Sequence, residues 1–235
     1  MKQVQTFRNS HRTILNGKEI SLALKEDILT LRLRPGQMIS ENEVAELYNV
    51  SRTPVKNAFT RLESEGFIEV VPKKGTFVTL IDCEYIRAIV HMRYVMEVNV
   101  CKTIIREPCL QAITEKLEKN LAEQQRLISL GEVSSTCFYK VDSRFHLSLF
   151  ERVGQERVWS IIQANQLHYT RFRLLDSQMN AGYDQLYQKH MELFRALCDR
   201  DEARFEHHMY GHLHDYLHHV IKSVSGEQRS YLANF

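Results

Sequence analysis

Four side chains in the C-terminal half of the sequence have the chemistry and the spacing of metal ligands. Asp142 and His146 are four residues apart, so on a helix both project from one face, and Phe145 places that face near the core. His190 and His212 each lie within a run of helically spaced apolar residues. Three imidazoles and one carboxylate suit Zn²⁺ as the expected ion, with Ni²⁺, Mn²⁺ or Fe²⁺ as alternatives.

Each of these histidines also has an ordinary structural explanation. A single inward-facing histidine is more often a hydrogen-bonded core residue than a ligand, because an imidazole without a partner is costly to bury. His208 lies one helical turn before His212 and competes with it for an inward position. The residue pattern alone therefore leaves two alternatives, a metal site and a polar core.

The segments that would position these side chains are expected to be helices. From Ile81 onward the apolar spacing is helical, and glycines separate several of the segments. Their approximate limits are 82–106, 110–130, 134–152, 155–176, 183–199 and 201–223. We expect an all-α helical bundle without a sheet over 82–223, followed by a flexible tail over 224–235.

The first third of the chain follows a different pattern, in which a helix, a helix–turn–helix and a short hairpin succeed one another. Ser40 with Glu43 three residues later predicts a capping box, and Ser51 is expected to cap the next helix. The expected helices cover about 20–31, 41–48 and 53–65, and the hairpin strands 67–71 and 76–80. The sequence thus predicts a mainly α protein whose residues 1–81 form a winged helix–turn–helix with a basic N-terminal arm.

The third of these helices has the residues that a DNA-reading helix needs. Such a helix contacts DNA with polar or cationic side chains of its N-terminal turn. Arg52 and Lys56 lie four apart on one face with Thr53 beside them, and Arg61 extends this cationic edge. Residues 21–80 contain eight Lys or Arg and eight Asp or Glu, so the segregation of charge is the signal. A winged helix that docks a protein, with a metal used only for stability, is the alternative.

The run Val50-Ser51-Arg52-Thr53-Pro54-Val55, with Leu33-Arg34-Pro35-Gly36 before it and Gly75-Thr76-Phe77-Val78 after it, resembles the N-terminal domain of the GntR family of bacterial regulators. In that family the matching recognition-helix residues contact operator DNA, and the hairpin tip approaches the minor groove. The resemblance and the charge pattern together give the expected DNA-binding set Ser51, Arg52, Thr53, Lys56, Asn42, Arg61, Lys74 and Gly75.

Two positions of this set depart from the family pattern. Lys56 stands where arginine is usual, and Asn42 stands at a position that is sometimes arginine. Lysine is a point charge and lacks the bidentate fork that reads guanine. We therefore expect Lys56 to hold phosphate rather than to specify a base.

Residues 85–220 resemble the FCD (FadR C-terminal) domain, in Arg93 with Glu97, Asp142-x-x-Phe145-His146, His190 and His212-Leu213. In the metal-containing branch of that domain, the residues matching Asp142, His146, His190 and His212 bind an ion that helps to hold an effector, often a small carboxylic acid. Gln155 departs from the asparagine that is common there. Arg93, Arg171 and Arg173 are the candidates to bind the effector carboxylate, with surface exposure or an ion pair to Glu97 as the alternative.

These expectations describe a ligand-responsive transcription regulator and not an enzyme. We expect a homodimer that binds palindromic double-stranded operator DNA, as a repressor, with its affinity modulated by the effector. A metal-dependent, hydrolase-like enzyme is the rival, but no general base or nucleophile accompanies the four ligands. No apolar run of membrane-spanning length and no secretory signal is evident, so the cytoplasm is the expected location. Five widely spaced cysteines predict reduced, mostly buried thiols.

Overall fold

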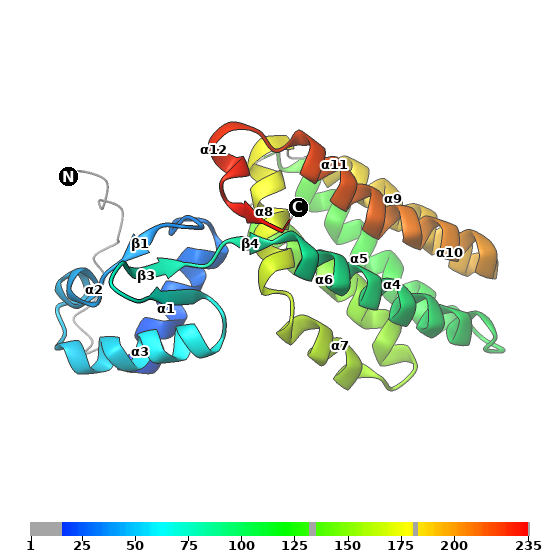
Figure 1. The fold of residues 1–235 in the computed structure, drawn as a ribbon. Coiled ribbons are helices and arrows are strands. Elements are labelled where there is room, and N and C mark those ends of the chain that lie inside the picture. The colour runs from blue at the N-terminus through cyan, green and yellow to red at the C-terminus, as the bar shows by residue number, and fades with distance from the viewer. Residues whose placement is uncertain (1–15, 132–134, 181–182, 235) are drawn as a thin grey trace. The chain divides into compact units, whose positions relative to one another are not determined.

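The computed structural model describes residues 16–131, 135–180 and 183–234 (Figure 1). The chain divides into two compact units. The first consists of the residues up to Ile28 together with Gly36–Thr79, and the second of Leu29–Pro35 together with the residues from Leu80 onward. The expected basic arm lies largely in residues 1–15, outside the described residues.

The first unit contains three helices and a three-stranded antiparallel sheet in the order β1-β3-β2 (Figure 1). The elements are α1 (Gly17–Leu29), β1 (Met38–Ile39), α2 (Glu41–Tyr48), α3 (Arg52–Ser64), β2 (Ile68–Val71) and β3 (Gly75–Val78). Apolar side chains at three- and four-residue intervals on α1 and α3 are buried, as helical periodicity requires: Ile20, Leu24, Ile28, Val55, Phe59 and Leu62. The winged helix–turn–helix expected from the sequence is confirmed, with β1 as an additional short strand.

Local contacts determine how α1, α2 and α3 begin. Ser40 caps α2, but it accepts a hydrogen bond from the Asn42 amide at 3.2 Å rather than from the Glu43 amide of the expected capping box. Ser51 occupies the N-cap position of α3, but its side chain makes no capping hydrogen bond, contrary to expectation. A Cβ atom on Gly17 would lie 2.9 Å from the Pro54 carbonyl oxygen, so only glycine allows α1 to begin this close to α3.

The second unit is a helical bundle (Figure 1). Its buried side chains form one large apolar core. Its helices are α4 (Cys83–Ile105), α5 (Gln111–Ser129), α6 (Ser135–Arg152), α7 (Glu156–Ala164), α8 (Leu167–Asn180), α9 (Tyr183–Cys198), α10 (Glu202–Tyr210), the π-helix η1 (Gly211–Asp215), α11 (Tyr216–Ser223) and α12 (Gly226–Arg229). Two short strands, β4 (Ile81–Asp82) and β5 (Leu232–Ala233), pair in parallel. The core combines side chains of α4 to α11, including η1.

Two of the expected helices are interrupted. The helix expected over 155–176 is broken at Asn165 and Gln166, which separate α7 from α8. The helix expected over 201–223 contains the π-helical segment η1. Neither interruption involves a proline, so the sequence carried no strong signal for it.

The tail expected to be flexible over 224–235 is instead folded as far as it is described. It forms α12 and β5, and the Ile81 amide donates a hydrogen bond to the Tyr231 carbonyl at 2.8 Å. Val224 and Leu232 are buried in the core and supply the free energy that holds the tail down. The bundle therefore contains one short strand pair, which the sequence did not predict.

Three of the five cysteines also differ from expectation. All five are free, but only Cys83 and Cys101 are buried, whereas Cys109, Cys137 and Cys198 are exposed. Among the described residues, no helix has the length and apolar character needed to cross a membrane.

Candidate metal centre and nucleic-acid interface

Three histidines from separate elements of the second unit meet in its interior. His146 on α6, His190 on α9 and His212 on η1 each offer a ring nitrogen, and these atoms lie within 4.8 Å of one another. All three side chains are buried. The Nε2 atoms of His146 and His212 are 3.2 Å apart. Nitrogens bound to one ion at about 2.0–2.1 Å lie roughly 3 Å apart, so the spacing fits a shared transition metal.

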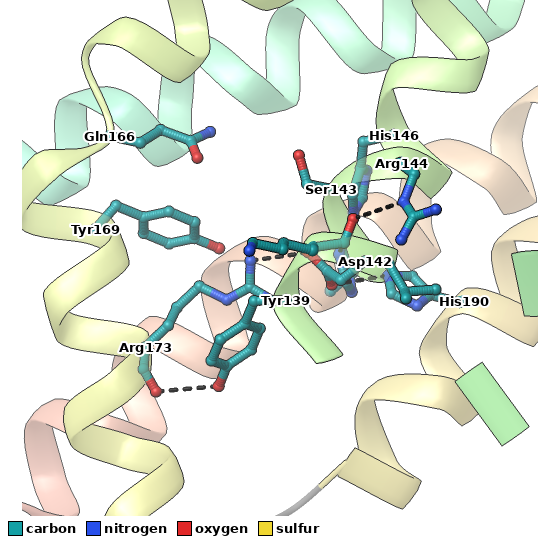
Figure 2. Close-up of polar contacts among 12 residues, drawn as sticks. Tyr139, Asp142, Ser143, Arg144, His146, Gln166, Tyr169, Arg173 and His190 are labelled. Atoms are coloured by element: carbon teal, nitrogen blue, oxygen red, sulfur yellow. Dashed lines mark hydrogen bonds and ion pairs between the residues drawn. The ribbon is translucent and has the colours of Figure 1, made fainter. Parts of the chain in front are cut away.

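Asp142 adds a carboxylate to this cluster (Figure 2). It lies one helical turn before His146 on α6, and its Oδ1 atom is 3.4 Å from Nε2 of His190. Neither of these two buried atoms has a hydrogen-bond partner among the described residues. Buried polar atoms without partners are rare in folded proteins, and a bound cation would satisfy both.

The hydrogen bonds behind His190 determine which of its nitrogens carries the proton. Asn120 donates to the backbone carbonyl of Val141, which can only accept, so the Asn120 oxygen is left to accept from the Gln124 amide nitrogen. The Gln124 oxygen must then accept from Nδ1 of His190 at 2.8 Å. Burial lowers the pKa of His190 to about 3, so the ring is neutral near pH 7. Its Nε2 lone pair therefore faces the Asp142 carboxylate, an arrangement of two acceptors that a cation between them would stabilise.

His146 is oriented in the same way by a carboxylate. Its Nδ1 atom is 2.5 Å from Oε2 of Glu97, which is itself 2.7 Å from Nε of Arg93. Burial raises the pKa of the Glu97 carboxyl, but Arg93 and His146 outweigh this effect and hold the pKa below its usual value. Ionised Glu97 accepts from Nδ1, so the His146 Nε2 lone pair points into the cluster. A carboxylate behind a histidine is the usual support of a metal-binding imidazole.

His212 reaches the cluster from the π-helical segment. The rival position, His208, is one turn earlier on α10, where its ring is 3.3 Å from the Glu192 carboxylate and only partly buried. A π-helical turn inside an α-helix is often found at functional sites. The structure therefore assigns the inward position to His212.

The three candidate effector-binding arginines have different surroundings. Arg93 pairs with Glu97 and donates to the Tyr169 hydroxyl at 3.2 Å, so the intramolecular ion pair considered above is present. Arg173 pairs with Oδ2 of Asp142 at 2.8 Å (Figure 2). Burial raises the pKa of the Asp142 carboxyl, but Arg173 and His190 outweigh burial and hold the pKa below its usual range.

Arg171 does not join the other two arginines. Its guanidinium donates to the Leu80 carbonyl at 2.9 Å and lies 3.2 Å from Nδ1 of His168. Residues two apart on a helix point to nearly opposite sides, so Arg171 and Arg173 serve different faces of α8. Arg171 therefore lies on another face of α8 than Arg173, and its expected contact with the effector stays a prediction.

In the first unit, all the residues expected to bind DNA lie at the surface: Ser51, Arg52, Thr53, Lys56, Asn42, Arg61, Lys74 and Gly75. Arg52 and Lys56 are exposed, whereas Val55 and Phe59 of the same helix are buried. Arg61 is engaged by Glu65 at 3.0 Å in an exposed ion pair. The α3 surface thus presents cations near its N-terminus, where a recognition helix needs them.

Comparison with known proteins identifies both units. Residues 16–78 match the family model of bacterial regulatory proteins of the gntR family, and residues 88–215 match the FCD domain. The chain belongs to the GntR family. GntR-family proteins with an FCD domain are DNA-binding transcription regulators, and the similar proteins are regulators and not enzymes.

Similar GntR-family regulators cover most of the chain. An HTH-type transcriptional regulator from Streptomyces ambofaciens is 33% identical over 187 residues, which cover 79% of this chain and 77% of that protein. The transcriptional repressor RspR from Escherichia coli K12 is 29% identical over 203 residues, covering 85% and 86% respectively. Among solved structures, a GntR regulator from Rhodococcus sp. RHA1 has a TM-score of 0.66 at 18% identity, covering 89% of this chain and 99% of that one. At that identity the likeness shows the fold alone.

Several supporting residues of this GntR-family regulator were missed in the sequence. Gln124 and Asn120 orient His190, and Tyr169 contacts Arg93. Gln124 continues the buried stripe of α5 that contains Leu117 and Leu121, and it is itself completely buried. A polar residue inside an apolar stripe was the available signal, because such a residue needs a buried partner.

The support of His146 by Glu97 gives a first prediction. We expect Glu97→Gln to weaken Zn²⁺ binding about 10- to 100-fold, because the neutral amide no longer raises the basicity of the His146 imidazole. Competition with a chromophoric chelator measures this affinity. Glu202→Gln, which changes a carboxylate in a surface pair with Arg106, is the matched control and should leave affinity unchanged. Equal affinities for both variants would remove Glu97 from the site.

Proposed function

We propose that this GntR-family regulator is a metal-loaded repressor whose affinity for a palindromic operator is modulated by a small carboxylate effector. The single observation that carries the metal site is the His190 Nε2 lone pair facing the Asp142 carboxylate across 3.4 Å. Asp142, His146, His190 and His212 would hold the ion, with zinc expected. When bound, the ion supplies a Lewis-acid site for an effector oxygen.

The groups beside the cluster favour an anionic effector. Nη2 of Arg93 and Nε2 of Gln166 are buried donors without a partner among the described residues. Figure 2 shows Gln166 and Tyr169 directed toward the part of α6 that carries Asp142. Glu97 and Asp142 already balance Arg93 and Arg173. A divalent ion therefore adds two uncompensated buried positive charges, and each effector carboxylate would offset one of them.

The DNA side of the proposal uses the exposed face of α3. In this proposal Arg52, Thr53 and Ser51 contact bases and phosphates, and Lys56 contacts phosphate. Their exposure supports it, as does the Ser51 hydroxyl, which makes no capping hydrogen bond. A homodimer formed through the helical unit would present two such helices to half-sites about 34 Å apart. The name of RspR as a repressor supports the proposed sign of regulation. A regulator of this kind would work in the cytoplasm.

A thermal-shift screen tests the metal-dependent part. We expect Zn²⁺ to raise the melting temperature of chelator-treated protein, and some small carboxylic acids to raise it further only when Zn²⁺ is present. A ligand at 100 times its Kd stabilises by about 2.7 kcal/mol. The same acids should change affinity for a duplex selected from random sequences.

Two outcomes would overturn the proposal. If Zn²⁺ produces no shift, the metal site is wrong. If carboxylates act equally well in chelator, the effector does not use the metal.

A further inference from the structure

We propose that α8 transmits the state of the metal site to the segment Leu80–Asp82, with Arg171 and His168 as the positioning residues. This inference rests on the proposed function. It names the helix that would connect the metal site with the DNA-binding part of that function. Leu80–Asp82 directly follows Thr79, the last residue of the first unit. A change in this segment is therefore passed on through the covalent chain.

The two faces of α8 have different partners. Tyr169 and Arg173 are four residues apart and share one face, and they contact Arg93 and Asp142 respectively. His168 and Arg171 are three apart and share another face. One face of α8 thus contacts residues that belong to the metal cluster or support it. Another face makes a second set of polar contacts.

The second set holds the backbone of Leu80–Asp82. Arg171 donates to the Leu80 carbonyl at 2.9 Å, and the Asp82 amide donates to Nδ1 of His168 at 3.1 Å. Between them, the Ile81 amide donates to the Tyr231 carbonyl in the β4–β5 pair. Three successive residues are therefore held through main-chain atoms. Because α8 supplies two of these bonds, a movement of α8 must either carry the segment along or break them.

The protonation states of His168 and Arg171 suit their hydrogen bonds to the backbone of Leu80–Asp82. Burial lowers the pKa of His168 to about 4, so the neutral ring keeps an acceptor for the Asp82 amide near pH 7. Burial also lowers the pKa of Arg171 to about 10, which leaves it charged. A completely buried cation is expensive, and the Leu80 carbonyl is one of the acceptors that compensate it.

The link to the metal site is the ion pair between Arg173 and Asp142. Oδ2 of Asp142 accepts from Arg173, while Oδ1 faces His190. A cation that binds the carboxylate competes with Arg173 for its negative charge and weakens the bond that ties α8 to α6. The Tyr139 hydroxyl also donates to the Arg173 carbonyl at 3.0 Å, so this turn of α8 is anchored to α6 by two bonds. Metal binding is therefore expected to affect α8 at Arg173, through the ion pair with Asp142.

Hydrogen exchange of the full-length protein tests the inference, with Zn²⁺ alone as the probe. In the wild type we expect Zn²⁺ to change the exchange rate of the peptide containing the Ile81 and Asp82 amides by about fivefold or more. Arg171→Met keeps the side-chain length but removes the donors, and should abolish this response. The response of α6 and the Zn²⁺ affinity should remain. Arg195→Met, an exposed arginine on α9, is the matched control.

A second pair of variants controls for a folding defect in Arg171→Met. His168→Phe removes the acceptor and should abolish the response, whereas His168→Asn places an amide oxygen near the Nδ1 position and should restore it. Absence of Zn²⁺ binding in the wild type would refute the proposed function itself. Normal Zn²⁺ binding with an unresponsive segment, or a response that survives in both His168→Phe and Arg171→Met, would refute the role of α8 alone.

Discussion

Purified His190→Ala protein is expected to contain no stoichiometric metal, and zinc should no longer raise its melting temperature. His190 contributes the nitrogen that faces the Asp142 carboxylate, and its replacement leaves that carboxylate in its ion pair with Arg173. If zinc is present at about 1,000 times its Kd, the wild type gains about 4.1 kcal/mol from binding. The variant should lose nearly all of this increment.

The loss of the ring must be separated from the loss of the metal. His190 stacks on Phe145 with ring centroids 4.6 Å apart, so the alanine variant loses packing as well as a ligand. The melting temperatures of the metal-free proteins measure the packing effect, and the additional shift on adding zinc measures the binding effect. His207→Ala removes an exposed histidine from α10 and should behave as the wild type. One metal ion per chain in His190→Ala, by elemental analysis, would eliminate the site.

The periodicity of apolar residues was sufficient to predict most of the helices. Long stripes such as Ile20, Leu24 and Ile28 on α1 allow only one helical face to be buried. The same reasoning placed His146 and His190 inside, because each lies on a face defined by large apolar neighbours. These side chains are indeed buried.

What could not be predicted depends on contacts between segments far apart in the chain. The π-helical turn that carries His212 has no local signature, since its residues also suit an α-helix. Among the described residues of the tail, Val224 and Leu232 are the two buried apolar ones, which is too few to show a period. Their burial depends on how the helices of the second unit pack around them.

The arginines show the same limit. Arg93 and Glu97 are four residues apart, so their pairing was a local alternative that could be considered from the sequence. The partner of Arg173 is 31 residues away, and that of Arg171 is 91 residues away. Which carboxylate or carbonyl a buried guanidinium meets is determined by how α8 packs, and the sequence pattern does not contain that information.

The second large effect concerns DNA. We expect Arg52→Ala to lower affinity for the selected duplex about 5- to 150-fold, the equivalent of the 1–3 kcal/mol that one good base contact contributes to discrimination. Because Arg52 is exposed, its loss should change the stability of the fold by no more than about 0.5 kcal/mol. Lys56→Ala should instead weaken binding to all sequences alike and reduce the slope of log affinity against log salt by about 1.

Fluorescence anisotropy at several salt concentrations, with specific and scrambled duplexes, distinguishes these roles. Arg204→Ala removes the same charge from the surface of the second unit and controls for the change in net charge. An equal loss on specific and scrambled DNA would make Arg52 a phosphate contact rather than a base contact. If both Arg52→Ala and Lys56→Ala bind DNA as tightly as the wild type, neither side chain contacts DNA, and the role of α3 as the reading helix is refuted.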